Sequence, residues 1–175
     1  MHRARLYRIG AGLIGSLPLP LLQLIGTIAG SMIWLFSSKT SAVLRTNIKL
    51  VFPELTPSEQ TLLARASSIE TGKMIFENLY VWTQDHQKVL THITQVRGLS
   101  KAKAALKNGK GLVLVLPHIG NWEVLNHLLG KEFALVHMHQ PASNKAINEL
   151  IQNFRARTGT RFTPVGTRGI RQQLK

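Results

Sequence analysis

The sequence contains no cysteine, which excludes disulfide bonds, thiolate nucleophiles and cysteine-ligated zinc sites. Acidic residues are scarce as well, because 8 Asp and Glu stand against 22 Lys and Arg, and the formal net charge is +14. A surface of this charge attracts polyanions: nucleic acids, anionic lipid headgroups or acidic proteins. The 175 residues show no zinc finger, helix-turn-helix or aromatic RNA-binding motif, so we do not expect a nucleic acid as the partner.

Charged residues are missing altogether from residues 9–38. This run is longer than the roughly 20 apolar residues that a membrane-spanning helix needs, although Pro18 and Pro20 interrupt it. We therefore expect a membrane anchor over residues 1–40, as a single span or as a helix lying in one leaflet. A signal peptide and a buried core helix are the alternatives. Basic residues flank both sides, so charge does not set the orientation: Arg3, Arg5, Arg8, Lys39, Arg45 and Lys49.

Residues 41–92 are predicted to be helical. Pro53 ends a first helical stretch, and a compact helix-start signal follows it. Thr56 can cap the next helix, Pro57 suits its first position, and Glu59 completes a capping box. Apolar residues then recur with helical spacing, which predicts a helix that continues to about Trp82.

From residue 93 onward, short apolar runs alternate with helical patterns. Strands are expected at 93–96, 112–116, 133–137 and 161–165, and helices at 100–108, 121–129, 143–158 and from Thr167. Ser100 is predicted to cap the first of these helices and Asn108-Gly109 to end it. This alternation predicts an α/β domain over 93–175 with a largely parallel sheet. Since a sheet usually has about 5–6 strands, we expect that part of the domain lies beyond Lys175.

The segment Pro117-His118-Ile119-Gly120-Asn121-Trp122-Glu123 directly follows the apolar run at 112–116. Ligands of parallel sheets bind beyond the carboxyl ends of strands, where His118 is expected. Gly120 would permit a tight turn, Asn121 would cap the next helix, and the first helical turn would bring Glu123 back toward His118. A carboxylate beside an imidazole can fix its tautomer and raise its basicity, so that the imidazole can deprotonate a hydroxyl, which makes His118 and Glu123 candidate catalytic residues. A purely structural histidine is the alternative.

The motif H-I-G-N-W-E resembles the corresponding block of the late lipid A biosynthesis acyltransferases, within the lysophospholipid acyltransferase superfamily. Glutamate at its end is more typical of this branch than of the glycerolipid branch, which usually has aspartate. The basic start with a long apolar helix, the block R-T-N-I-K-L-V-F-P-E-L and the segment N-F-R-A-R-T-G also resemble family blocks. The resemblance covers nearly the whole chain and implies a glycerolipid acyltransferase-like fold.

The resemblance implies transfer of a fatty acyl chain from acyl carrier protein to a hydroxyl of a lipid A precursor, at the cytoplasmic face of a bacterial inner membrane. His118 would be the general base and Glu123 would hold it, with no metal and no cofactor apart from the acyl carrier protein donor. Arg155 matches a downstream family block and would contact a lipid phosphate, with Arg157 as the weaker candidate. We group Gly120, Asn121, Arg155 and Arg157 as substrate-binding candidates.

Charge and the remaining motifs agree with this interpretation. Residues 97–175 contain 13 Lys and Arg against 3 Glu, a net charge of +10, and both expected substrates are anionic. Trp122 is expected to pack beneath the His118 turn. His137 and His139 have a metal-like spacing, but no acidic ligand accompanies them.

Two alternatives remain open at the level of sequence. The first is an acyltransferase for another lipid, such as lysophosphatidate. The second is an inactive, truncated basic protein of the membrane surface. The family has a further acidic motif beyond the point that corresponds to Lys175, so we expect these 175 residues alone to be inactive or poorly stable.

Overall fold

The structure is a computed structural model that describes residues 2–173, with the backbone alone for residues 2–4 and 168. The chain divides into two compact units. Unit 1 comprises residues 1–84 and 142–154, and unit 2 comprises residues 85–141 and 155–175. The side chain of Arg3, one of the basic residues before the apolar run, lies outside the described part.

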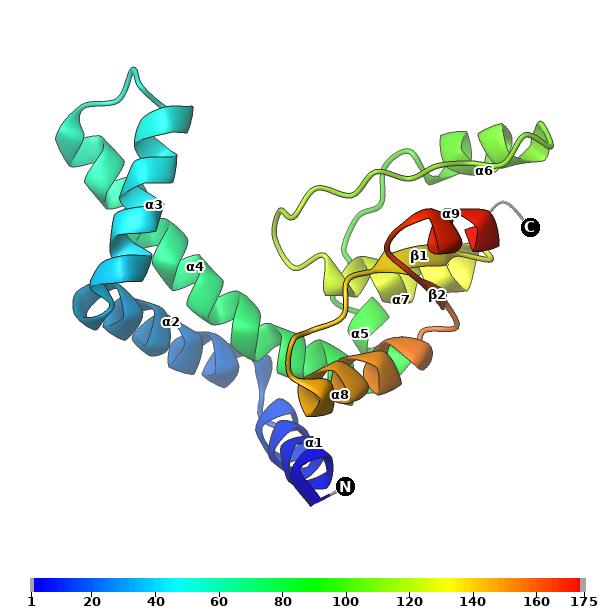
Figure 1. Ribbon diagram of the computed structural model, residues 1–175, viewed down its shortest axis with the longest axis horizontal. Coiled ribbons are helices and arrows are strands. Elements are labelled where there is room, and N and C mark those ends of the chain that lie inside the picture. Colours follow the sequence, from blue (N-terminus) through cyan, green and yellow to red (C-terminus); the bar gives the residue numbers. More distant parts are fainter. Residues whose placement is uncertain (1, 174–175) are drawn as a thin grey trace. The chain divides into compact units, whose positions relative to one another are not determined.

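Unit 1 is built from helices, and residues 85–92 of the helical region predicted at 41–92 belong to unit 2. Its helices are α1 (His2–Gly15), α2 (Leu19–Phe36), α3 (Ser38–Val51), α4 (Pro57–Thr83) and residues 145–154 of α8 (Lys145–Ala156). The predicted capping box at the start of α4 is confirmed: Thr56 Oγ1 accepts from the Glu59 amide at 3.3 Å, and Glu59 Oε2 accepts from the Thr56 amide at 2.8 Å. Helix α2 lies along α4, and α3 contacts the N-terminal part of α4 at a steep angle (Figure 1).

Small residues bring α2 and α4 into backbone contact. A Cβ atom on Gly26 would lie 2.5 Å from Lys73 Cα, and one on Gly72 would lie 2.3 Å from the Gly26 carbonyl oxygen. The Ser68 hydroxyl donates to the Gly30 carbonyl at 2.9 Å. Gly26 faces Gly72 and Lys73, and Gly30 faces Ser68, so the two helices run antiparallel. Their backbones lie closer together than a side chain at Gly26 or Gly72 would allow.

Helix α2 has two different faces. Leu22, Gly26 and Gly30 are buried, whereas the opposite side presents an apolar stripe with 41–71% of each side chain exposed: Leu21, Leu24, Ile28, Met32 and Leu35. Within the described residues, α2 alone is long and apolar enough to cross a membrane by length and composition. Helices α1, α4 and α8 pack on each other through a small core in which the Trp82 and Phe154 rings stack at 6.0 Å, with Ala11, Leu79 and Leu150 around them.

Unit 2 contains the α/β part of the chain. Its elements are α5 (His86–Leu90), α6 (Leu99–Lys107), α7 (Glu123–Glu132), β1 (Val136–His139), β2 (Arg161–Pro164) and α9 (Thr167–Gln173). The two strands pair in parallel, with Val136 opposite Arg161 and His139 opposite Pro164. Helix α8 connects them along the chain, which gives the strand–helix–strand order that the sequence predicts.

The predicted sheet is larger than the sheet in the structure. Between residues 2 and 173 there are two strands, so the strands expected at 93–96 and 112–116 are wrong, and β1 begins at Val136 rather than Phe133. Residues 112–116 are without regular structure, and Val113 and Val115 are 87% and 86% exposed. An apolar run becomes a strand only when another strand supplies hydrogen-bond partners, and in the described residues none pairs with this run.

Helix ends in unit 2 follow the predictions in part. Asn108 is the C-cap of α6, and Gly109 follows with φ +72°, as predicted. Ser100 is not its cap, because α6 already begins at Leu99, and Gly98 occupies the capping position with φ +82°. Glycine adopts this left-handed backbone without strain, so the helix starts earlier than a serine cap would dictate.

Candidate functional site

A tight turn carries the candidate catalytic motif in unit 2. The Ile119 amide donates to the Pro117 carbonyl at 2.9 Å, and the Trp122 amide donates to the Gly120 carbonyl at 3.2 Å. Gly120 has φ +59°, which confirms that the turn needs glycine here. A Cβ atom at Gly120 would meet nothing within 4 Å, so the space beside this turn is open.

Asn121 does not cap α7, contrary to the prediction. The helix begins at Glu123, Trp122 occupies the capping position, and no side chain caps the helix. The main chain replaces the expected contact, because the Asn121 carbonyl accepts from the Val124 amide at 3.3 Å. The Asn121 side chain is half-buried.

His118 is exposed and lies against Trp122. The two rings stack with their centroids 5.5 Å apart and an interplanar angle of 28°. Trp122 therefore packs beneath the turn as predicted. The indole thus supports the exposed imidazole on one face.

Glu123 is almost fully buried, at 2% exposure, and it is paired with Arg155. Arg155 Nε donates to both carboxylate oxygens at 3.2 Å, and Nη2 makes an ion pair with Oε1. Asn126 Nδ2 donates to Oε2 at 3.0 Å. A buried carboxylate normally needs such compensation, and here a planar guanidinium and an amide supply it together.

Arg155 makes two further contacts with its surroundings. Its Nη1 atom lies 3.2 Å from Nδ1 of His139, and its guanidinium carbon lies 4.9 Å from the centroid of the Trp122 ring. The Arg155 side chain is only 13% exposed. Trp122 thus contacts both the exposed His118 ring and the guanidinium that holds Glu123.

The structure therefore brings together Glu123 and Arg155, two residues that sequence reasoning assigned to separate roles. It does not join His118 to Glu123, since no hydrogen bond links them within the described part of the chain, and the carboxylate is engaged by Arg155 and Asn126. Arg157, the second arginine candidate, is exposed.

Asn126 and His127 of α7 were not singled out from the sequence. Asn126 follows Glu123 by three positions, so their contact across one helical turn could have been found from the helix period. The contact of His139 with Arg155 could not, because it depends on how β1 lies relative to α8. His127, 5% exposed, approaches His86 with 3.1 Å between their Nδ1 atoms, and this pair had no sequence signal.

The pKa of His137, a residue of β1, is lowered. Burial lowers the pKa of its imidazole, the positive charge of Arg155 lowers it further, and the Glu123 carboxylate opposes both effects. Nε2 of His137 is buried and has no hydrogen-bond partner within the described residues. Burial and Arg155 therefore favour the neutral form of His137.

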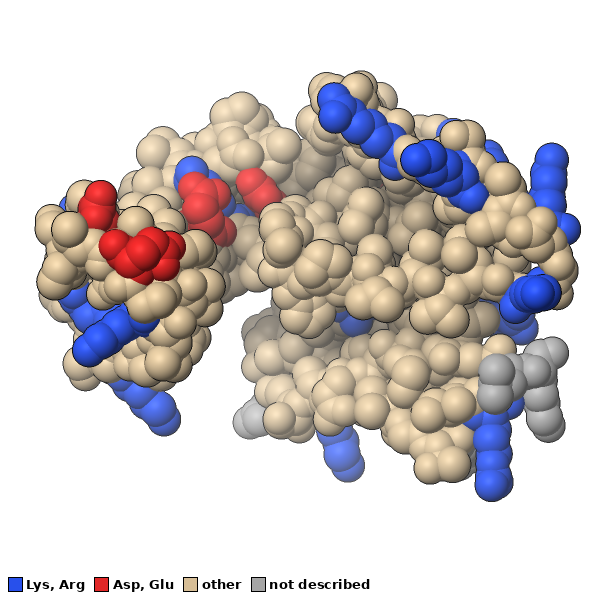
Figure 2. Space-filling view, turned by 90° about the horizontal axis from the view of Figure 1, so that it is seen from above, with Lys and Arg blue, Asp and Glu red and all other residues tan. Residues whose placement is uncertain are grey.

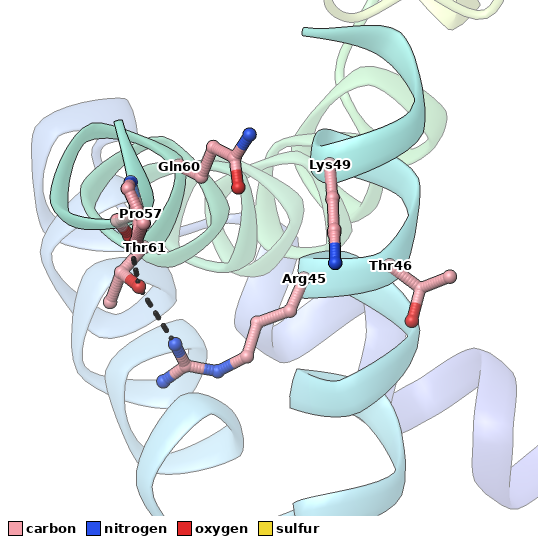
Figure 3. A pocket seen from close by; sticks show the side chains of 6 residues that line it. All are labelled: Arg45, Thr46, Lys49, Pro57, Gln60 and Thr61. Atoms are coloured by element: carbon pink, nitrogen blue, oxygen red, sulfur yellow. Dashed lines mark hydrogen bonds between the residues drawn. The ribbon is translucent and has the colours of Figure 1, made fainter. Parts of the chain in front are cut away.

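Unit 1 contains a separate pocket between α3 and α4 (Figure 3). Arg45, Lys49 and Thr46 of α3 line it together with Pro57, Gln60 and Thr61 of α4. Arg45 Nη1 donates to Thr61 Oγ1 at 2.9 Å, and the Arg45 guanidinium also lies 4.3 Å from the centroid of the Trp34 ring. Part of the R-T-N-I-K-L-V-F-P-E-L block thus lines a basic pocket.

The surface reflects the excess of basic residues. On the face drawn in Figure 2, Lys and Arg side chains are spread widely, whereas the visible Asp and Glu side chains gather in one region. Such a surface fits the anionic partners expected from the composition.

Comparison with known proteins agrees with the resemblance that the motifs indicate. The sequence model of the family described as bacterial lipid A biosynthesis acyltransferase matches residues 3–175. A lipid A biosynthesis palmitoleoyltransferase of Escherichia coli strain K12 is 24% identical over 155 residues, which cover 89% of this chain and 50% of that protein. A lipid A biosynthesis acyltransferase of Haemophilus influenzae is 26% identical over 147 residues, which cover 81% of this chain and 45% of that protein.

The chain spans about half the length of these curated relatives. The match to the family nevertheless extends over almost all of its residues, including the H-I-G-N-W-E turn and the segment that supplies Arg155. The chain belongs to the bacterial lipid A biosynthesis acyltransferase family.

Proposed function

We propose that the protein transfers a fatty acyl chain from acyl carrier protein to a hydroxyl of a lipid A precursor, with His118 as the general base. The observation that carries the proposal is the turn at His118, which exposes the imidazole directly before the buried Glu123–Arg155 pair. An exposed base on a firmly held turn is what deprotonation of a bulky lipid hydroxyl requires.

The reaction is an ester formation in which each bond change is balanced. His118 takes the proton of the acceptor hydroxyl as the oxygen attacks the thioester carbonyl carbon. The carbon–sulfur bond then breaks, and the sulfur of the carrier leaves as a thiol after it receives the proton from the imidazolium. The products are an acyl ester of the lipid and free carrier, and His118 is neutral again.

Glu123 supports His118 through the turn rather than through a hydrogen bond to it. Arg155 and Asn126 hold its carboxylate, and the Arg155 guanidinium lies over the Trp122 ring on which His118 stacks. Loss of Glu123 would free Arg155 and loosen Trp122, and the imidazole would lose its support. A direct contact between His118 and Glu123 requires the turn to rearrange when substrate binds, and catalytic hydrogen bonds often tighten at that stage.

The charge of the protein fits both proposed substrates and the membrane. Acyl carrier protein, the phosphates of lipid A precursors and inner-membrane headgroups are all anionic, and the chain carries a net charge of +14. Helix α2, with its uncharged and largely exposed sequence, is the proposed attachment to the inner membrane, with the chemistry on the cytoplasmic side. The proposed reaction needs no metal or cofactor.

The direct test is an acyl transfer assay with the whole protein in inner-membrane vesicles. Acyl carrier proteins loaded with chains of different lengths serve as donors, and product is detected by mass spectrometry. The proposal expects acylation of a lipid A precursor and little acylation of lysophosphatidate, which is offered in parallel at the same concentration. Preferential acylation of lysophosphatidate would reassign the acceptor, and no transfer to either lipid would refute the proposal.

A further inference from the structure

Helix α2 is apolar enough to cross a membrane, but the packing of unit 1 sets a condition on how it can do so. We propose that α2 lies in one leaflet of the membrane, with both of its ends on the same side, rather than spanning the bilayer. This proposal rests on the membrane attachment proposed above and adds the orientation of the attached helix. The orientation follows from helix α4, which covers the face of α2 that contains Gly26 and Gly30.

That covering helix, α4, is charged where it meets the middle of α2. Lys73 packs its backbone against Gly26, near the centre of α2, and its ammonium group is ion-paired with Glu70 at 2.7 Å. Glu77 accepts a hydrogen bond of 2.9 Å from Gln23. Lys73 of α4 therefore packs against the centre of α2, and Glu77 lies beside its N-terminal part.

A spanning orientation would carry these charges into the hydrocarbon core. With 18 residues at about 1.5 Å each, α2 is about 27 Å long, which is close to the hydrocarbon thickness of about 30 Å. Its centre would then lie at the bilayer midplane, and Lys73 would lie there as well. Charged side chains at that depth are costly and rare.

The α4 helix cannot move aside without breaking a close contact. Gly26 and Gly72 pack backbone against backbone, and the Ser68 hydroxyl is bonded to the Gly30 carbonyl. Ser68 is 2% exposed at this contact. The pair of helices therefore enters or leaves the membrane as one body.

An orientation within one leaflet satisfies both faces of α2. The exposed stripe at Leu21, Leu24, Ile28, Met32 and Leu35 faces the acyl chains, and α4 remains on the aqueous side. Residues 1–53 contain no Asp or Glu, and their basic side chains on α1 and α3 fit a surface of anionic headgroups: Arg5, Arg8, Lys39, Arg45 and Lys49.

The absence of cysteine from these 175 residues makes the orientation directly measurable. Ser16 and Ser38 are exposed residues beyond the two ends of α2, and Ser100 is an exposed residue of α6 in unit 2. Each is changed to cysteine in a separate variant, which is a nearly isosteric change. The three variants are labelled with a membrane-impermeant maleimide in sealed inside-out inner-membrane vesicles, with and without detergent.

The proposal expects all three positions to be labelled to the same extent, without any gain on adding detergent. If Ser16→Cys and Ser38→Cys are labelled from opposite sides, α2 spans the membrane and the proposal is overturned. Protein that remains in the supernatant during vesicle preparation would refute the membrane attachment itself. Failure of the attachment and failure of the orientation are therefore distinguishable.

A second measurement tests whether α4 stays beside α2 in the membrane. The double variant Gln23→Cys with Glu77→Cys places thiols where the side chains now share a hydrogen bond. A short bismaleimide should cross-link this pair in vesicles. The matched control, Gln23→Cys with Glu59→Cys, uses the far end of α4 and should not react. Absence of the first cross-link would remove the reason for an orientation within one leaflet.

Discussion

Arg155 holds Glu123 by donating from Nε to both carboxylate oxygens at 3.2 Å, across 32 positions of sequence. Both side chains are nearly buried, at 13% and 2% exposure. Removing one member of a buried ion pair strands the other charge in a poorly solvated place, so the cost is far larger than the net value of the pair.

We therefore predict that Arg155→Met lowers the free energy of unfolding by about 3–5 kcal/mol. The double variant Arg155→Met with Glu123→Gln should be less destabilised, because it leaves no unpaired charge. Urea denaturation followed by circular dichroism measures both. The control is Lys103→Met, which breaks the more exposed Lys103–Glu132 pair and should cost much less than Arg155→Met. Equal costs for Arg155→Met and Lys103→Met would show that the pair is not buried in solution.

His118 should affect turnover without affecting the fold. Because the imidazole is exposed, His118→Ala should change the free energy of unfolding by less than about 0.5 kcal/mol. As the proposed general base, the same change should reduce acyl transfer by about 10²–10⁴-fold. His92→Ala, which removes another exposed imidazole, is the control and should retain activity. Near-normal transfer by His118→Ala would exclude it as the base.

The contact between α2 and α4 predicts opposite effects of the same substitution at two glycines. Gly72→Ala would force a Cβ atom to within 2.3 Å of the Gly26 carbonyl oxygen, so it should destabilise unit 1 by about 1–3 kcal/mol. At Gly12, in α1, a Cβ atom would meet nothing within 4 Å. Gly12→Ala should therefore stabilise by up to about 1 kcal/mol through helix propensity. Thermal unfolding in detergent compares them, and the prediction fails if both changes have the same sign.

Protonation of His137 should destabilise the fold. Its pKa is lowered in the folded state by burial and by Arg155, so the unfolded chain takes up the proton first as the pH falls. The stability contributed by neutral His137 is complete above the ordinary pKa of about 6.5 and is lost as the pH falls from there toward the lowered value. His137→Phe should show a smaller loss of stability between pH 7 and pH 5 than the unmodified protein. Identical pH profiles would contradict this assignment.

Attachment through α2 predicts that a polar substitution in the exposed stripe of α2 weakens membrane binding more than one at an exposed position of α4. Deleting residues 9–38 would release the protein, as the sequence suggests, but it would also uncover the buried face of α4. A single substitution is therefore a more specific test of the anchor than this deletion. Ile28→Asn, in the exposed stripe, should weaken binding to vesicles by at least about tenfold, from the roughly 1.5–3 kcal/mol that a buried isoleucine contributes. Leu62→Asn, at an exposed position of α4, is the control. Equal flotation of both variants with vesicles at high salt would place the anchor elsewhere.

Features that depend on a few neighbouring residues could be predicted from the sequence. The capping box at Thr56 and Glu59 and the helix end at Asn108 and Gly109 are local signals, and the structure has both. Ser100 shows the limit of such signals, because a glycine in the left-handed conformation begins the helix before it.

Features that depend on distant partners could not be predicted. The run at 112–116 has the composition of a buried strand, yet a strand exists only when a neighbour satisfies its backbone. Glu123 and Arg155 were both recognised as site residues, but their pairing requires the turn at Gly120, helix α7 and the end of α8 to meet. The spacing of residues along the chain does not show that these segments lie close together. The sequence analysis therefore expected His118, not Arg155, as the direct partner of Glu123.

The glycine contact between α2 and α4 also has a consequence for how this sequence can change over generations. With no room for a Cβ atom at Gly26 or Gly72, neither helix can acquire a side chain there while the other stays in place. A larger residue on one helix requires the axes to separate, and that would break the hydrogen bond from Ser68 to Gly30 on the same face. Divergence in this region should therefore proceed by coupled replacements in both helices, whereas Gly10 and Gly12, which face open space, are free to drift independently.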